Sequence, residues 1–366
     1  AASAYSLRRL GPYNGSALRI RRTSDNVEVN VAFNSAEAVD VDSPITNTTE
    51  QGGESGSTTA TTLGEFLTEG GNQDATVHTW YDQSGNAKDA SQDTAGNQPK
   101  IAEGGSLLAD GINFESGVNL PLSGSGLDVF RDVAYGQIFS VIKPRETGTG
   151  FARYFEATIG TGSDARFLFG DGQDVAAAFR IGGRSLDGDS FGDEESPTSH
   201  NNELSLITGF LNYTDAEGFV FLNGTQVATN SIPNITAGNT SDTSSQNVAI
   251  GSYNASLTAE FNAKEIIIYN SDQSSNRFRI ESNINNYYGL SNVGLTGNWT
   301  ADGNEEAFTA DGQDGFTCQV ATASVYVGQQ LSEKLPSGGF INLSFDLDLQ
   351  PLGGTAASIN LILKKT

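Results

Sequence analysis

Aromatic and acidic side chains that could handle a sugar stand together in the string 80–86, Trp-Tyr-Asp-Gln-Ser-Gly-Asn. The rings of Trp80 and Tyr81 have flat faces that can stack on a sugar ring, although alternation along a strand would bury at least one of them. Asp82 is a candidate for sugar binding or for catalysis. In the competing interpretation its carboxylate accepts backbone N–H groups in a tight turn, and Gly85 adopts a positive φ.

The acidic stretch 187–195 resembles the first half of a calcium-binding loop. Asp187 and Asp189 occupy positions one and three and a Gly occupies position six, but position five is a Phe and position twelve a Thr. We therefore expect a solvated acidic loop. The alternative is weak Ca²⁺ binding by Asp187, Asp189 and Asp193.

Other chemistry is limited by composition. Cys318 is the single cysteine and there are two histidines, so we expect no disulfide within the chain and no zinc or copper site. No nucleophile-elbow or phosphate-loop pattern is present. Apart from Ca²⁺, we expect no cofactor.

The charge balance excludes further classes of partner. The chain has 44 Asp and Glu against 20 Lys and Arg, a net charge of −24. Such a surface repels phosphate groups and anionic lipids, so we expect no nucleic-acid partner. No apolar run approaches the roughly 20 residues of a membrane span, so we expect no membrane insertion.

Basic residues are concentrated at the start of the chain. Residues 1–22 contain five arginines and no acid. This segment either packs against the acidic body of the same chain or docks on an acidic neighbour. The second alternative would support self-assembly or binding to other structural subunits.

Short alternating apolar runs separated by turn residues dominate the pattern. Residues 17–23 alternate, Asn223-Gly224 is a hairpin signal, a short helix is expected near residue 63, and helical spacing is found over 272–288 with Gly289 at its end. Further strands are expected at 138–142, 166–169, 175–181, 204–211, 218–222, 247–250 and 265–269. The pattern predicts an all-β fold, a two-sheet sandwich over 1–291 followed by a smaller β domain over 292–366. The second unit is short for a jelly roll, so we expect a segment of a longer modular protein.

The 80–86 string, followed by Ala90 and Gln92, resembles a signature of the α-L-arabinofuranosidase B catalytic-domain family. Segments within 5–26 resemble the start of that family, so the likeness covers about the first 100 residues. Segments 265–270, 280–281 and 288–290 resemble the closing strand and helix of laminin-G and concanavalin-like sandwiches. The resemblance implies a concanavalin-like jelly-roll sandwich over 1–291.

The family's catalytic residues are not matched. Aligned on Gly170-Asp171-Gly172, its nucleophilic Glu falls on Arg180. Aligned on the strand end 249–252, its acid/base Asp falls on Tyr253, and its adjacent Cys pair is missing. A guanidinium cannot attack an anomeric carbon, and a phenol with a pKa near 10 is a poor general acid at neutral pH. We therefore expect that the chain is not an enzyme, and that Arg180 and Tyr253 join Trp80, Tyr81 and Asp82 in glycan binding.

These observations lead to one functional hypothesis and two alternatives. We expect a non-catalytic structural or adhesion protein of a virion, such as a tail or head fibre or a capsid-associated protein, or of a cell surface. Its expected partners are cell-surface or extracellular glycans, and its expected location is the virion surface or the extracellular space. The alternatives are an arabinofuranosidase-like hydrolase and a secreted lectin module.

Overall fold

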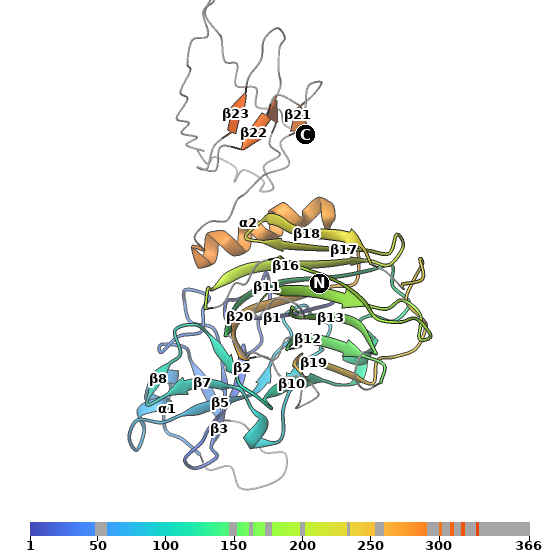
Figure 1. The fold of residues 1–366 in the computed structure, drawn as a ribbon. Helices are drawn as coiled ribbons and strands as arrows, with labels where there is room; N and C mark the ends of the chain where they lie inside the picture. Colours follow the sequence, from blue (N-terminus) through green and yellow to red (C-terminus); the bar gives the residue numbers. More distant parts are fainter. Residues whose placement is uncertain are drawn as a thin grey trace, which may run out of the picture.

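The protein is almost entirely β in its computed structural model, which confirms the predicted fold class (Figure 1). The structure describes residues 1–47, 57–145, 152–160, 164–172, 178–197, 202–232, 235–252 and 260–290, together with 300–301, 308–310, 316–318 and 327–328. All strand pairings are antiparallel, as expected for a chain with short turns between strands.

One sheet, here called sheet I, has the strand order β18-β17-β16-β11-β20-β1. Its strands are β1 (Ser3–Ser6), β11 (Tyr135–Arg145), β16 (Ser205–Asn212), β17 (Glu217–Leu222), β18 (Thr225–Ser231) and β20 (Glu260–Tyr269). The N-terminal strand β1 therefore lies beside β20, more than 250 residues later in the chain, with Ser3 opposite Ile268.

The second sheet, sheet II, has the order β15-β14-β13-β12-β19-β10. Its strands are β10 (Asn119–Leu122), β12 (Arg153–Thr158), β13 (Ala165–Asp171), β14 (Phe179–Gly183), β15 (Gly192–Glu195) and β19 (Asn247–Gly251). Ile181 of β14 packs within 2.9 Å of the position that a Cβ would occupy on Gly209 of β16, so the two sheets face one another closely.

Shorter N-terminal strands connect the sheets at the end seen at the lower left of Figure 1. They are β2 (Leu18–Arg22), β3 (Glu28–Val31), β4 (Ile45–Asn47), β5 (Ala75–Trp80), β6 (Ala90–Ser91), β7 (Lys100–Glu103), β8 (Ser106–Leu107) and β9 (Ile112–Phe114). Strand β10 of sheet II pairs with β6, and β6 pairs with β5. Strand β5 also pairs with β7, β7 with β9, and β9 with β20 of sheet I, so these strands join the two sheets.

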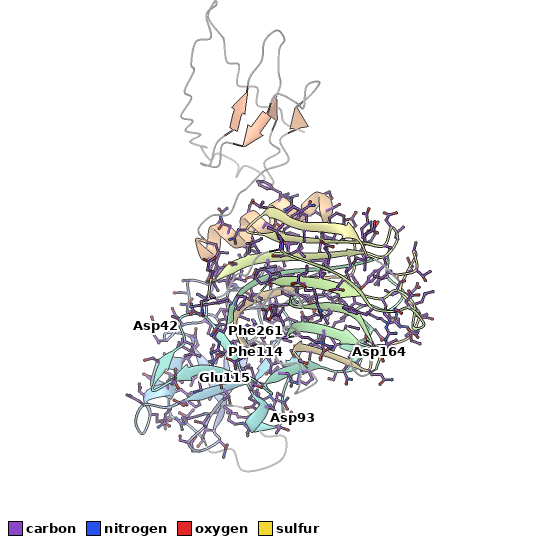
Figure 2. The ribbon with its side chains drawn as sticks, viewed as in Figure 1. Asp42, Asp93, Phe114, Glu115, Asp164 and Phe261 are labelled. Carbon is purple, nitrogen blue, oxygen red and sulfur yellow. The ribbon has the colours of Figure 1, made fainter. Side chains whose placement is uncertain are left out.

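Aromatic side chains fill the space between the sheets. Phe130 stacks on Phe167 with ring centroids 4.6 Å apart, and Phe114 stacks on Phe261 at 4.5 Å. Figure 2 shows Phe114 and Phe261 inside the body of the molecule, whereas Asp93 and Asp164 lie near its edges. Burial of these rings supplies much of the apolar driving force for folding.

The predicted short helix and hairpin are confirmed, whereas the strand expected at 175–181 begins outside the described residues and is seen as β14, Phe179–Gly183. Helix α1 (Leu63–Thr68) begins with a capping box formed by Thr62 and Glu65, and it buries Leu63, Phe66 and Leu67. The Asn223-Gly224 turn has φ of 48° and 80°, values that favour these two residue types in a tight hairpin between β17 and β18.

Helix α2 (Arg277–Tyr288) confirms the predicted helix, although a 3₁₀ turn, Ser274–Asn276, precedes it. Ile284 is buried in a second apolar cluster that includes Phe139 and Ile267 of sheet I. Tyr287, three residues further along the helix, is 43% exposed. Its place against the body is taken by Tyr288, whose hydroxyl lies 3.2 Å from Glu265 Oε2.

Within 292–366 the structure describes two short antiparallel pairs. Strand β21 (Thr300–Ala301) pairs with β24 (Val327–Gly328), and β22 (Phe308–Ala310) pairs with β23 (Phe316–Cys318). The expected boundary near 291 lies outside the described residues and stays a prediction. In the described part of the chain, no helix has the length and apolar character needed to cross a membrane.

The arginines of residues 1–22 pair within the chain. Arg8 pairs with Glu265, Arg9 with Glu37, Arg19 and Arg21 with Glu28, and Arg22 with Asp25 and Glu69. This arrangement matches the first of the two alternatives, packing against the acidic body of the same chain. Self-assembly stays a prediction that these contacts do not support.

Candidate functional site

The two aromatic residues of the 80–86 string lie in different surroundings. Trp80 is fully buried, with its ring centroid 5.9 Å from that of Tyr5, so its role as a sugar-stacking residue is a wrong prediction. Tyr81 is half-buried, and its hydroxyl donates a 2.8 Å hydrogen bond to Asn30 Oδ1. One ring of the pair therefore belongs to the core, as alternation predicted.

Asp82 organises a turn. Its carboxylate accepts hydrogen bonds from the backbone N–H groups of Ala4 (2.8 Å), Ser84 (2.9 Å) and Lys88 (3.0 Å), and Gly85 has a φ of +86°. With the side chain saturated in this way and the residue 3% exposed, Asp82 cannot contact a glycan, which corrects that prediction. The turn matters for another reason, because it places Gln83 and Ser84 on the wall of a groove.

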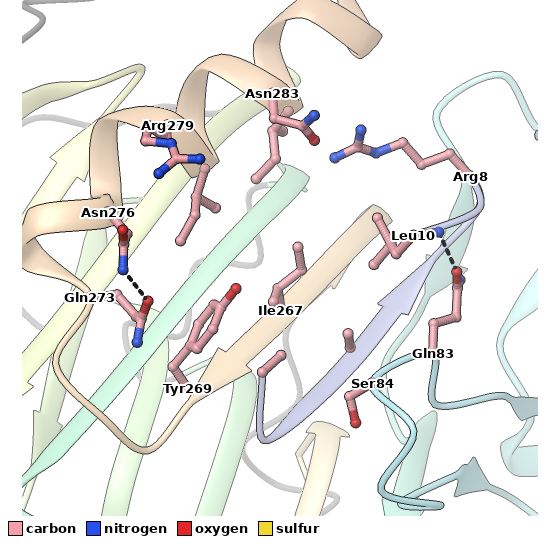
Figure 3. A pocket seen from close by; sticks show the side chains of 14 residues that line it. Arg8, Leu10, Gln83, Ser84, Ile267, Tyr269, Gln273, Asn276, Arg279 and Asn283 are labelled. Atoms are coloured by element: carbon pink, nitrogen blue, oxygen red, sulfur yellow. Dashed lines mark hydrogen bonds between the residues drawn. The ribbon is translucent and has the colours of Figure 1, made fainter. Parts of the chain in front are cut away.

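This groove lies between sheet I and α2 and has a volume of about 570 Å³, a size that suits a small ligand. Figure 3 shows its lining. The lining residues are Ala1, Ala4, Arg8, Leu10, Gln83, Ser84, Ile267, Tyr269, Gln273, Asn276, Arg279, Ile280, Asn283 and Ile284. We call this site the helix groove.

Alternation along β20 forms the floor of the helix groove. Ile266 and Ile268 point into the core between the sheets, so Ile267 and Tyr269 face α2. The Tyr269 ring packs edge-on against Phe139 at 5.8 Å, and its hydroxyl points into the groove (Figure 3). Burial and the nearby Glu265 raise the pKa of Tyr269, so its hydroxyl remains a hydrogen-bond donor at neutral pH.

Helical spacing along α2 forms one wall. Ile280 and Ile284 turn toward the sheet, whereas Arg279 and Asn283, four residues apart, stay exposed above them. Asn276, just before the helix, donates a 3.0 Å hydrogen bond to Gln273 Oε1, which fixes the amide at that end.

The opposite wall is rigid. Arg8 is held by Glu265 through Nε at 2.7 Å and Nη2 at 2.8 Å. Gln83 accepts from the Leu10 N–H at 2.8 Å and donates to the Ser6 carbonyl at 2.8 Å. The groove therefore has two preorganised sides and a third, on α2, whose polar groups face solvent.

Arg180 lies elsewhere, on the face of sheet II that points away from the aromatic core. The strand register aligns two rows on this face, Glu156–Leu168–Gly182–Asp193 and Arg153–Gly170–Arg180–Glu195. We call it the charge-row face. A Cβ on Gly182 would lie 2.5 Å from the Phe191 ring, so glycine leaves the room that Phe191 occupies beside Arg180.

A β-bulge between Arg153 and Phe155 makes the charge-row face. On a regular strand residues 153 and 156 would point to opposite faces, but the extra residue brings Arg153 and Glu156 onto one face, where they form an ion pair. Ser252 donates a 3.2 Å hydrogen bond to Glu156, which is 1% exposed. No sequence signal marked these two residues, because a bulge breaks the alternation on which strand patterns depend.

Arg180 itself is 4% exposed. Its Nη1 lies 3.7 Å from Asp193 Oδ2, and its guanidinium lies 5.5 Å from the centre of the Phe191 ring. Burial lowers the pKa of Arg180, and the Asp193 carboxylate opposes that shift. Tyr253, its expected partner in glycan binding, lies outside the described residues.

The three carboxylates of the expected calcium loop have separate protein partners. Asp187 pairs with Arg166 and accepts from the Thr243 hydroxyl, and Asp193 belongs to the charge-row face. Asp189 accepts from the Thr236 N–H at 2.9 Å. Among the described residues, no three His, Cys, Asp or Glu side chains are placed to hold a metal ion. Ca²⁺ binding stays a prediction, with its expected ligands turned toward other groups.

Comparison with known proteins gives structural likenesses only. No family model and no curated protein matches the chain. A GH54 α-L-arabinofuranosidase soaked with a cyclic sulfate inhibitor is 15% identical, with a TM-score of 0.48, over 77% of this chain and 62% of that one. Trypanosoma rangeli sialidase is 16% identical, with a TM-score of 0.38, over 54% of this chain and 29% of that one. A heptameric SAP-like pentraxin from Limulus polyphemus is 14% identical, with a TM-score of 0.29, over 40% and 68%.

All three likenesses have TM-scores below 0.5, so the β fold of this chain is established by its own strand pairings. The arabinofuranosidase and the sialidase are glycoside hydrolases, and this finding contradicts the prediction that the chain is not an enzyme. The comparisons give no support to a virion or adhesion role. What these two neighbours have in common is a function on carbohydrate.

Proposed function

We propose that this protein binds carbohydrate in the helix groove. The observation that carries the proposal is the combination of an aromatic floor, Tyr269, with exposed polar side chains on α2. Sugar rings have apolar C–H faces that pack on an aromatic ring, and their hydroxyls both donate and accept hydrogen bonds. An Asn amide such as that of Asn283 also does both, which makes it a suitable partner for a sugar hydroxyl.

The test is binding of neutral plant and microbial oligosaccharides on an array, followed by titration calorimetry of the strongest ligand. Tyr269→Ala should weaken binding at least about tenfold, because the stacking surface is lost. Asn283→Ala should weaken it without disturbing the fold, because this side chain is exposed. The matched control is Tyr135→Ala, a half-buried tyrosine of β11 that lies outside the groove and stacks on Phe210. Equal losses in Tyr135→Ala and Tyr269→Ala would contradict the proposal.

A second candidate function, hydrolysis of a glycoside, is favoured by Glu156. This carboxylate lies on the same face as Arg180, the position onto which the sequence resemblance places the nucleophile of the arabinofuranosidase B family. Retaining glycosidases need a carboxylate nucleophile and a second carboxyl group about 5–5.5 Å away. Asp193 lies in the same register row as Glu156 but three strands away, roughly 14 Å, so the second carboxyl group must be another one. The buried ion pairs of this face stabilise a fold weakly, which favours a functional reason for keeping them.

Release of nitrophenol from 4-nitrophenyl α-L-arabinofuranoside tests this second function. Glu156→Gln keeps the size of the side chain and removes its charge, so it should lower the rate at least about 100-fold. Ser252→Ala, which removes one hydrogen bond to Glu156, should have a smaller effect. If the wild-type chain released nitrophenol no faster than buffer alone, the proposed hydrolysis would be contradicted. The proposal of glycan binding in the helix groove would be unaffected.

The expected location of the protein is part of the same proposal. Glycans are displayed outside cells, so we propose a virion-surface, cell-surface or extracellular setting, supported by the acidic, Gly-rich β composition. Antibody labelling of intact particles and cells in the electron microscope tests it. Label confined to the cell interior would contradict it.

A further inference from the structure

We infer that the sugar bound in the helix groove carries a carboxylate, as a uronic acid residue of a short oligosaccharide does. This inference rests on the proposed glycan binding and names the class of glycan. Among the described residues, the lining of the groove offers an anion two arginine side chains and no acidic side chain.

The charge of the lining is the first step. Acids outnumber bases 44 to 20 in the chain, yet the described residues that line the groove include two arginines and neither Asp nor Glu. Electrostatic repulsion would keep an anion away from most of the surface of such a protein. In the lining of the groove, by contrast, basic residues outnumber acidic ones.

The two arginines differ in what they can offer. Arg8 is 7% exposed, and Glu265 neutralises it through a two-point contact. Arg279 is exposed, and in the described part of the chain no carboxylate forms an ion pair with it. Figure 3 shows Arg8 and Arg279 on either side of Asn283, extending toward one another over the groove. Arg279 therefore supplies the uncompensated positive charge.

The geometry matches one sugar ring with one carboxylate. A guanidinium presents parallel N–H donors that fit the two oxygens of a carboxylate. Arg279 can take this group while Asn283, one turn along the same face of α2, takes a ring hydroxyl and the Tyr269 ring supports the apolar side of the sugar. A single uncompensated guanidinium suits a ligand with few charges, and the net charge of −24 disfavours a long polyanion.

The experiment compares digalacturonic acid with its dimethyl ester, which has the same sugar rings without the negative charges. Titration calorimetry at 0.15 M salt should give at least about tenfold tighter binding of the acid to the wild-type chain, because charge-assisted hydrogen bonds are stronger than neutral ones. Arg279→Gln should abolish this difference, so that the acid and the ester bind the variant equally. Arg279→Lys should restore part of the preference for the acid.

The matched control is Arg131→Gln, an exposed arginine outside the groove that pairs with Asp242. It should leave the preference unchanged, and an equal loss in Arg131→Gln and Arg279→Gln would overturn the inference by showing a general charge effect. Equal binding of acid and ester by the wild-type chain would overturn the inference while the proposed glycan binding survives. If neither these ligands nor any array glycan binds, the proposed function fails as well.

Discussion

The charge-row face and the helix groove differ in the burial and the ion pairing of their arginines. On the charge-row face, Arg153 is paired with Glu156 and Arg180 with Asp193. The side chains of Arg153, Glu156 and Arg180 are nearly enclosed, whereas that of Asp193 is 30% exposed. In the helix groove, Arg279 is exposed and forms no ion pair with a described residue. A buried charge that loses its partner costs much stability, whereas an exposed charge costs little and remains free to bind a ligand. Substitutions in the first region should therefore change unfolding, and those in the second should change binding.

The largest expected effect is that of Arg153→Met. It leaves Glu156 buried at 1% exposure without its ion-pair partner, so the free energy of unfolding should fall by about 3–5 kcal/mol. Urea denaturation followed by tryptophan fluorescence measures this change. The double variant Arg153→Met with Glu156→Leu should recover much of the loss, because no unpaired charge remains. A single-variant loss below about 1 kcal/mol would show that water reaches Glu156 and that the face is open.

A smaller loss is expected for Asp82→Ala, which acts on the wall of the groove. The buried carboxylate accepts three backbone N–H groups, and each donor left unsatisfied in the interior costs about 1–3 kcal/mol unless water replaces the acceptor. With the turn partly hydrated, we expect a loss of about 2–3 kcal/mol in the free energy of unfolding. Binding in the groove should weaken too, because the turn positions Gln83 and Ser84. Asp82→Asn, which keeps one acceptor oxygen, should lose less.

The residues behind these two predictions show what the sequence could reveal. The Asp82 turn, the Asn223-Gly224 hairpin and α2 depend on neighbours within a few positions, and each was predictable from residue type and spacing. The helix groove unites Ala4 with Ile267 and Arg279, and the bulge that pairs Arg153 with Glu156 breaks the alternation that marks a strand. Both depend on contacts or register between distant segments. A polar stripe at helical spacing, Asn276, Arg279 and Asn283, was the one available signal for the groove.

A modest, pH-dependent effect is expected at Asp189, in the loop between β14 and β15. Although partial burial works to raise it, the pKa of Asp189 is lowered to about 2 by hydrogen bonds from the N–H groups of Leu186 and Thr236 and from the hydroxyls of Thr236 and Ser185. A lowered pKa contributes stability above the ordinary value near 3.9, and this contribution disappears as the pH falls toward 2. Asp189→Ala should therefore lower the Tm at pH 7, and the difference from the wild-type chain should shrink between about pH 4 and pH 2. A constant difference over that range would contradict this account.

The smallest effects on stability are expected from two substitutions on α2 that should change ligand binding, Arg279→Gln and Asn283→Ala. Arg279 and Asn283 are exposed on α2, so Arg279→Gln should alter the free energy of unfolding by less than about 0.5 kcal/mol. Arg and Gln have similar helix propensities, whereas Asn283→Ala replaces a weak helix former with the strongest one and should stabilise α2 by a few tenths of a kcal/mol. Urea denaturation of both variants beside Arg153→Met measures the contrast directly. If Arg279→Gln cost more than about 1 kcal/mol, its guanidinium would belong to the structural network, and a loss of ligand binding would then reflect a disturbed helix.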